Sequence, residues 1–542
     1  MKILPPETIR EICKYCTGWD VWETRKALAS LARTSKAFRD ESSDELWASV
    51  PVKALFDALP SRTILKIGIS DKAIVKFKSE LMTASDWDSF YRRTFSVREL
   101  YLDNAGGVEI CILSSIFPSQ SHVEQAIPRL IRLHLPRKDY YGHSTTPWLI
   151  LQVFLVPKLQ FLKVNSFGES GWDFIKVVPK RCPVLESLDL SQLHGWPNDD
   201  KAVFSDMIRE LENLKSYNGP IFQERFGRGL SLLPRLEHVS IETRFGFDRS
   251  HSLALGSLPF PALSSISLSV DPSTYGRPGN AIELLRAISS KHGEHERRPL
   301  SASIQFVELP LLEDVRECCS ILSSYSHFDL QSISLTAQID DDIEDEDTEV
   351  SELALTLIRP LLRSVFLRKA ILNVTHQVYF TDADVQEMAR AWPHLEILKF
   401  NEEACWNTQP KITLDGLRSL LSNCTQLYEL AIAITVPWSN YNGAERQLGT
   451  LDSTYGIGHA MLAAFNLLDS DIEDELFFCV AIAQLAPYVR ICMLNSELGR
   501  IGRAVKDAQR LPSCVTGPRI DDSLAAFLAD WGTSESGSEE EW

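Results

Sequence analysis

A short apolar motif recurs along the chain and restricts the possible folds more than any other feature. The motif is L-x-x-L-x-L, with other apolar residues standing in for leucine. Its L-x-L part alternates every second residue, as a short strand with one buried face requires. The strong copies are Val97-Leu100-Leu102, Leu130-Leu133-Leu135, Leu159-Leu162-Val164, Leu185-Leu188-Leu190, Leu236-Val239-Ile241, Leu263-Ile266-Leu268, Leu330-Ile333-Leu335, Leu395-Leu398-Phe400, Leu427-Leu430-Ile432 and Val489-Cys492-Leu494. Weaker copies are Leu214-Tyr217, Ile304-Phe306 and Leu367-Ala370-Leu372.

The spacing of the copies and the prolines before them indicate a repeating unit. The first positions of the early strong copies are 33, 29, 26, 51 and 27 residues apart, and the 51 divides into 29 and 22 if Leu214 is counted. Proline disfavours helix in the residue before it, so it ends one element and lets the next run extended. Proline stands two residues before the first apolar position in seven copies, at Pro128, Pro157, Pro183, Pro234, Pro261, Pro393 and Pro487.

Segments with helical spacing lie between the predicted strands, for example residues 281–289, 350–362 and 414–421. One strand and one helix in a unit of about 30 residues cannot bury their own apolar face, so successive units must stack. The sequence therefore predicts an α/β solenoid over residues 95–500, with parallel strands on a concave face and helices outside. A doubly wound α/β domain would also alternate strands and helices, and it remains the structural alternative.

The first 50 residues lack the repeat and read as short helices. Pro5 and Pro6 suit a helix start, and Ile9 and Ile12 follow on one apolar stripe. A second helix includes Leu28 and Leu31, and Thr34 or Ser35 can cap a third. Residues 1–50 are predicted to form a helical domain, and residues 51–94 a helical linker.

The N-terminal pattern resembles an F-box. The resemblance is carried by LPPETIREI at positions 4–12, LASLARTSKAF at positions 28–38 and Leu46-Trp47. The whole chain resembles the fungal family of F-box proteins with degenerate leucine-rich repeats. It departs from that family at TGWDVW, positions 17–22, and at Cys13 and Cys16, where larger aliphatic residues are usual.

The resemblance implies a function in protein degradation. In that family the box binds the Skp adaptor of a cullin-RING ubiquitin ligase of the SCF type, and the repeats hold the protein to be ubiquitinated. This chain would then be the substrate-recognition subunit, with an unknown protein as its target. The alternative is a leucine-rich-repeat scaffold that acts outside any ligase. The positions implied to face the adaptor or to form the core of the box are Leu4, Pro5, Ile9, Ile12, Leu28, Leu31, Phe38 and Trp47.

Charge and composition exclude several other classes. The formal net charge of −18 disfavours nucleic acid as a partner. Acidic residues concentrate at 340–349, expected to be a solvated loop, and at the end of 501–542, expected to be an extension with a disordered tail. No apolar run approaches the roughly 20 residues of a membrane span, and the N-terminus lacks a signal peptide's apolar stretch. Eleven scattered cysteines suit reduced thiols, so we expect a cytoplasmic or nuclear protein.

No residue pattern favours an enzyme, a cofactor or a metal. Cys13 and Cys16 have metal spacing, but no second pair follows, and His292 and His295 lie in a polar stretch. Phosphate-loop, dinucleotide-binding, zinc-protease and serine-hydrolase motifs are missing from the sequence. We therefore expect a binding protein without catalytic residues.

Overall fold

The computed structural model divides the chain into two compact units, residues 1–293 and 294–542. It describes residues 5–15, 21–67, 74–102, 107–135, 146–165, 171–191, 201–221, 224–242, 260–270, 279–289, 298–307, 310–325, 328–337, 352–374, 376–403, 406, 408–437, 459, 461–473 and 475–492. The acidic segment 340–349 and the extension 501–542 lie outside the described residues, as do Leu4, Cys16, His292 and His295.

Unit 1 begins with three helices, α1 (Pro6–Tyr15), α2 (Val21–Thr34) and α3 (Lys36–Ala48). Ser35 caps α3, because its hydroxyl accepts a hydrogen bond from the backbone N–H of Phe38. Helix α3 contacts both α1 and α2, so it is the centre of this helical cluster. The three helices agree with those expected from the sequence.

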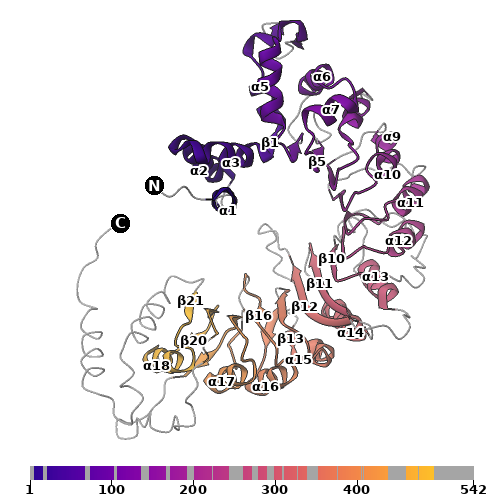
Figure 1. The fold of residues 1–542 in the computed structure, drawn as a ribbon. Helices are drawn as coiled ribbons and strands as arrows, with labels where there is room; N and C mark the ends of the chain where they lie inside the picture. Colours follow the sequence, from indigo (N-terminus) through magenta and orange to yellow (C-terminus); the bar gives the residue numbers. More distant parts are fainter. Residues whose placement is uncertain are drawn as a thin grey trace. The chain divides into compact units, whose positions relative to one another are not determined.

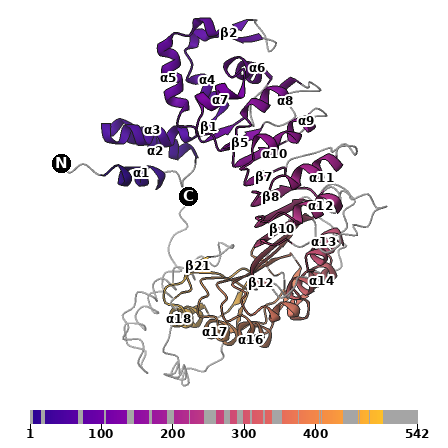
Figure 2. The same ribbon diagram turned by 45° about the vertical axis from the view of Figure 1, so that its right-hand side comes forward.

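A parallel sheet follows, in which the strands of unit 1 pair in the order of the sequence. Helices connect the strands and lie along one side of them in both views (Figures 1 and 2). The strands are β1 (Ser49–Pro51), β4 (Glu99–Tyr101), β5 (Arg132–Leu135), β6 (Phe161–Val164), β7 (Ser187–Asp189), β8 (Ser216–Gly219), β9 (His238–Glu242) and β10 (Ser265–Val270). The helices are α4 (Val52–Asp57), α5 (Ala84–Thr94), α6 (Gly107–Ile116), α7 (Gln120–Ala126), α8 (Thr146–Leu151), α9 (Gly171–Lys176), α10 (Val178–Arg181), α11 (Lys201–Arg209), α12 (Glu224–Ser231) and α13 (Gly279–Ser289).

Unit 2 repeats the same plan, with parallel strands in sequence order and helices on one side (Figure 1). The strands are β11 (Arg298–Phe306), β12 (Phe328–Ala337), β14 (Lys369–Asn373), β16 (Ile397–Phe400), β17 (Glu429–Ala431), β19 (Ala464–Asn466) and β21 (Arg490–Cys492). The helices are α14 (Leu312–Ser323), α15 (Leu355–Ile358), α16 (Asp382–Ala391), α17 (Leu414–Asn423) and α18 (Glu475–Leu485). Two short parallel pairs stand beside the sheet, β13 (Glu352–Ala354) with β15 (Gln377–Tyr379), and β18 (Thr435–Val436) with β20 (Asp471–Ile472).

The apolar motif forms the buried face of each sheet. Pairing places the middle positions of successive copies opposite one another, so that Leu100, Leu133, Leu162 and Leu188 form one row across unit 1. These four side chains are fully buried, and the first positions of the same copies are buried as well. The parallel strand–helix repeat predicted from the motif is therefore present in both units.

The weak copy at Leu214 is a full repeat with an unusual third position. Leu214 and Tyr217 are buried, and Tyr217 continues the row next to Leu188. The third position is Gly219, whose φ of +154° falls in the region that favours glycine. A Cβ at this residue would lie 2.9 Å from the Cβ of Leu190, which explains why no apolar side chain completes this copy. The 51-residue interval thus contains two repeats.

The register differs from the expected motif in a few places. In β11, Ala302 and Ile304 pair with Ile333 and Leu335, the middle and third motif positions of β12. The copy in β11 is therefore shifted by two residues from the expected pair Ile304-Phe306. In β21 it is Ile491, and not Cys492, that pairs with the motif residue Phe465 of β19. The copy at Leu462-Phe465-Leu467, which the sequence search missed, is fully buried. This copy is hard to recognise in the sequence because its middle position is phenylalanine and no proline precedes it.

Two segments between repeats also differ from expectation. Residues 51–94 contain α4 and α5, but an antiparallel pair, β2 (Ile64–Ile67) with β3 (Ile74–Phe77), lies between them. The segment 350–362 was expected to be one helix. It contains β13, the single turn α15 and the 3₁₀ turn Arg359–Arg363, because Pro360 removes a backbone donor and favours a break there.

A search of the described helices for membrane spans finds none with the length and apolar character needed to cross a bilayer.

Burial of the motif predicts a clear contrast between two leucines. We expect Leu188→Ala to destabilise unit 1 by about 2–5 kcal/mol, because Leu188 is fully buried and its truncation leaves a cavity. Leu232, at 56% exposure, is the matched control, and Leu232→Ala should change stability by less than about 0.5 kcal/mol. Urea unfolding followed by circular dichroism measures both. Equal shifts in the two midpoints would contradict the packing described above.

Candidate interaction surfaces

The helical cluster α1–α3 has a small core of its own. Ile9, Cys13 and Leu28 are the buried apolar residues of its described part, and Phe38 and Leu46 pack against them while half-buried. The Sγ of Cys13 lies 3.4 Å from the hydroxyl oxygen of Ser42, so this thiol occupies a satisfied position in the core. On the outside, the guanidinium of Arg10 pairs with the carboxylate of Glu41 at 3.1 Å, and this contact raises the pKa of Arg10.

The residues implied to face an adaptor separate into two groups in this cluster. Ile9 and Leu28 belong to the core, and Leu31, Phe38 and Trp47 are half-buried. Pro5 and Ile12 are exposed, so these two offer apolar surface at the start and middle of α1. Leu4, the remaining residue, lies outside the described part of the chain.

Trp47 has a second role that the sequence did not indicate. It lies three residues before Val50, and Val50 pairs with Leu100 in the buried row of unit 1. Trp47-Val50-Val52 is therefore the first copy of the repeat, with Val50 and Val52 buried. The last turn of α3 and the first strand of the sheet are continuous.

Polar contacts also hold α3 to the first repeats. The hydroxyl of Ser96 donates to the carboxylate of Asp44 at 2.5 Å, and Arg98 lies 3.6 Å from Glu45. The guanidinium of Arg25 in α2 donates to the backbone oxygen of Ser49 at 3.1 Å. Through these contacts the helical cluster is tied to the sheet.

The face of the unit 1 sheet that lies opposite the helices carries a ladder of polar and aromatic side chains on β4, β5 and β6. Tyr101 stacks on His134 with ring centroids 4.1 Å apart, and the His134 and Phe161 centroids are 5.0 Å apart. The Arg132 guanidinium lies 4.3 Å above the Phe161 ring and donates to Glu99 at 2.8 Å. These five residues alternate with buried motif residues. In the sequence they could have been found only as the polar and aromatic residues at the x positions of the motif.

Glu99 is the electrostatic centre of this ladder. Its Oε1 accepts from Arg132 and lies 2.9 Å from Nε2 of His134. Burial acts to raise the pKa of Glu99, but the hydrogen bonds from His134 and Arg132 outweigh it and lower the pKa to about 2. The carboxylate therefore stays ionised at neutral pH and orients both partners. Lys163 and Asp189 extend the ladder onto the next strand with an ion pair of 3.1 Å.

Reactive groups do not gather into a site in the part of the chain that the structure describes. The thiols of Cys318 and Cys319 are buried in α14, and burial raises the pKa of Cys318 to about 12 and that of Cys319 further. Both thiols are consequently protonated at neutral pH. Among the described residues, no group of three or more His, Cys, Asp or Glu side chains could hold a metal ion.

Sequence comparison identifies no relative, since no protein-family model matches the chain and no curated protein matches it significantly. Similar solved structures include the complex of Rad7 and Elc1 in yeast, with 16% identity, coverage of 63% of this chain and 71% of that chain, and a TM-score of 0.32. The complex of TLR13 with ssRNA13 has 12% identity and a TM-score of 0.26, and the match covers 75% of this chain and 63% of that chain. Similarity at this level carries no conclusion about function.

The Glu99 ladder predicts an acid-dependent loss of stability. The pKa of Glu99 is lower in the folded chain, at about 2, than its ordinary value of 4.5. Its ionised form therefore stabilises the fold above pH 4.5, and this contribution disappears as the pH falls toward 2. Glu99→Gln should cost about 1 kcal/mol at pH 7, after allowance for solvent screening, and almost nothing near pH 2. Urea titrations at several pH values test this.

Glu186→Gln serves as the control, because Glu186 makes a more exposed ion pair with Lys215 at 3.1 Å. We expect it to change stability by less than about 0.5 kcal/mol at pH 7. The difference in unfolding free energy between Glu99→Gln and the unaltered chain should shrink from pH 7 to pH 2. A constant difference would contradict the role assigned to the Glu99 carboxylate.

Proposed function

We propose that this protein is the substrate-recognition subunit of an SCF-type cullin-RING ubiquitin ligase. The observation that carries the proposal is the exposed apolar surface of Pro5 and Ile12 on a cluster whose core is already filled by Ile9, Cys13 and Leu28. This surface lies within the segment that resembles an F-box. A Skp-type adaptor would cover it, and the cullin would bind through the adaptor.

In this proposal the repeats hold the target protein, and the chain needs no catalytic residue. A target held beside the ligase gains a high effective concentration of its lysines near the ubiquitin carrier, on the order of millimolar where the geometry allows. The exposed strand face with the Glu99 ladder suits protein binding, because stacked aromatic and arginine side chains are common at the centres of interfaces. Such a protein would act in the cytoplasm or the nucleus.

The scaffold function is the second candidate, and one observation favours it. The helical cluster is tied to the first repeats through Asp44, Glu45 and Arg25, and Trp47 belongs to the first copy of the motif. A cluster built into the repeats in this way also suits a cap on the apolar end of the sheet, as the terminal repeats of solenoids require. A cap of this kind would need no adaptor.

Adaptor binding separates the two candidates. We expect the double variant Pro5→Ala, Ile12→Glu to weaken capture of a recombinant Skp-type adaptor about tenfold or more, since it removes an apolar anchor and adds a charge to the interface. Both side chains are exposed, so the fold should persist, and circular dichroism checks this. Quantitative pull-down or interferometry gives the affinity.

Thr8→Ala, at an exposed position of the same helix, is the matched control and should bind the adaptor as the unaltered chain does. If the unaltered chain fails to bind the adaptor, or if the double variant binds equally well, the ligase function is wrong and the scaffold function is favoured.

A further inference from the structure

One edge of the unit 2 sheet carries exposed apolar residues at a repeated position. The position is the turn residue just before the first apolar residue of each motif copy. In four copies of unit 2 it holds Phe366, His394, Met461 and Tyr488, which are exposed to 44% for Phe366, 57% for Met461 and 75% for Tyr488, and in two others it holds the polar residues Asp329 and Gln426. The strands that follow are parallel, so all four residues lie at the amino-terminal edge of the sheet. Phe366 and His394 stack with their rings 5° from parallel.

The repeat does not require apolar residues at this position. In unit 1 the same turn position holds the exposed charged residues Arg129, Lys158 and Arg235, and one exposed apolar residue, Val184. Turn residues are ordinarily small or polar, and neighbouring exposed apolar side chains in a soluble protein mark interaction sites. The apolar edge of unit 2, meaning Phe366, His394, Met461 and Tyr488, therefore points to a bound partner.

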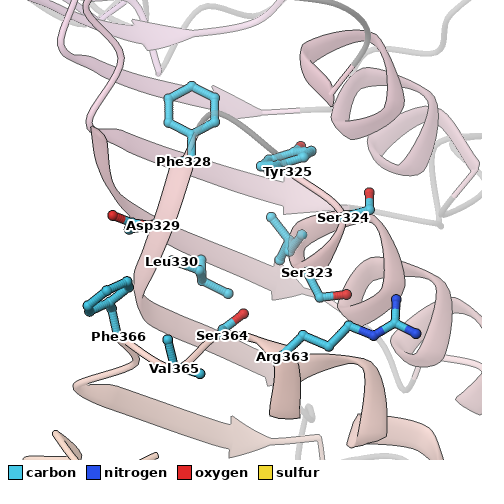
Figure 3. A pocket seen from close by; sticks show the side chains of 11 residues that line it. Ser323, Ser324, Tyr325, Phe328, Asp329, Leu330, Arg363, Ser364, Val365 and Phe366 are labelled. Atoms are coloured by element: carbon cyan, nitrogen blue, oxygen red, sulfur yellow. The ribbon is translucent and has the colours of Figure 1, made fainter. Parts of the chain in front are cut away.

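A pocket of about 200 Å³ lies at the β12 and β14 end of this edge (Figure 3). Its exposed lining is mainly polar, and Tyr325, Phe328, Leu330, Val365 and Phe366 supply the apolar part. Ligand and cofactor pockets usually measure about 300–1,000 Å³, so this one suits a single large side chain better than a cofactor. Phe366 belongs to both the pocket and the edge, which makes the two features one continuous surface.

The guanidinium of Arg363 also lines the pocket. Arg359 and Arg368 pair with Glu387 at 3.4 Å and Glu396 at 3.0 Å, whereas the described residues provide no ion pair for Arg363. Figure 3 shows the Arg363 guanidinium on the same side as Ser323 and Ser324, with the Asp329 carboxylate directed away from them.

Arg363 is the one cationic donor among the residues that line the pocket, and two of the lining serines have used their hydroxyl hydrogens. Ser323 donates to the backbone oxygen of Ser320 at 2.9 Å, and Ser324 donates to that of Ile321 at 2.7 Å. A hydroxyl has a single hydrogen, so neither serine has one left for a ligand. Guanidinium groups bind carboxylates with paired hydrogen bonds, so a carboxylate is the ligand group that this wall favours.

We infer that the amino-terminal edge of unit 2 binds a peptide segment of a partner protein in which a large apolar side chain stands beside an acidic one. The apolar side chain packs against the exposed Phe366 ring, and the carboxylate pairs with Arg363. The rest of the segment follows the edge past His394 toward Met461. The net charge of −18 does not prevent this, because at about 0.15 M salt charges more than roughly 8 Å away are largely screened. The inference requires no ligase and no adaptor.

Three synthetic peptides test this with the full-length protein. Their sequences are Gly-Ser-Glu-Phe-Glu-Gly-Ser, the same with lysine in place of glutamate, and the same with alanine in place of phenylalanine. Saturation-transfer NMR detects weak binding. We expect saturation of the phenylalanine ring protons in the acidic peptide, binding of the lysine peptide about tenfold weaker, and almost none of the alanine peptide.

Two variants assign the binding to this surface. Arg363→Gln should remove the preference for the acidic peptide over the lysine peptide, and Phe366→Ser should weaken both about tenfold. Arg359→Gln and Val184→Ser are the matched controls, since Arg359 is already paired and Val184 occupies the same turn position in unit 1. Neither control should alter binding.

The inference is overturned if none of the peptides binds, if acidic and lysine peptides bind equally, or if Arg363→Gln and Phe366→Ser bind as the unaltered protein does. It is likewise overturned if the controls lose binding to the same extent. Binding of the Skp-type adaptor is measured separately on the same variants. A failure of peptide binding can therefore be distinguished from a failure of the ligase function.

Discussion

Burial of one apolar face of every strand against its neighbours is the interaction on which the rest of the structure depends. A single strand–helix unit is too small to bury this face, so each repeat completes the core of the next. The row that includes Leu133, Leu162 and Leu188 is the result in unit 1, and Leu398 and Leu430 belong to its counterpart in unit 2. Stability is thereby spread along the chain, because each interior repeat packs against its neighbours.

This use of one face leaves the other face free to vary. Residues between the buried motif positions point away from the helices, where side-chain chemistry has little effect on the core. In unit 1 they form the ladder around Glu99, in which His134 and Arg132 hold a carboxylate ionised. The aromatic rings of Tyr101 and Phe161 pack on either side of the His134 ring in the same ladder.

The surfaces with proposed partners lie outside that core, and each is made by departures from the ordinary repeat. On α1, Ile12 stays exposed because Ile9 and Cys13 on the same helix already fill the cluster core. On unit 2, Phe366 and Tyr488 occupy turn positions that the fold allows to be polar. An exposed apolar side chain gains little from burial there, and binding is the role that we propose for these positions.

The sequence by itself determined the repeat, the parallel order of strands and helices, and the helical start of the chain, because period-two alternation and helix spacing are local properties of neighbouring residues. Only the tertiary structure decided the strand register at Ile491 and the place of Trp47 in the first repeat. It alone also separated the buried Ile9 from the exposed Ile12 and placed Arg363 and Phe366 around one pocket with Tyr325 and Phe328. These features depend on contacts between residues of different elements, and a motif that tolerates any apolar residue does not encode them.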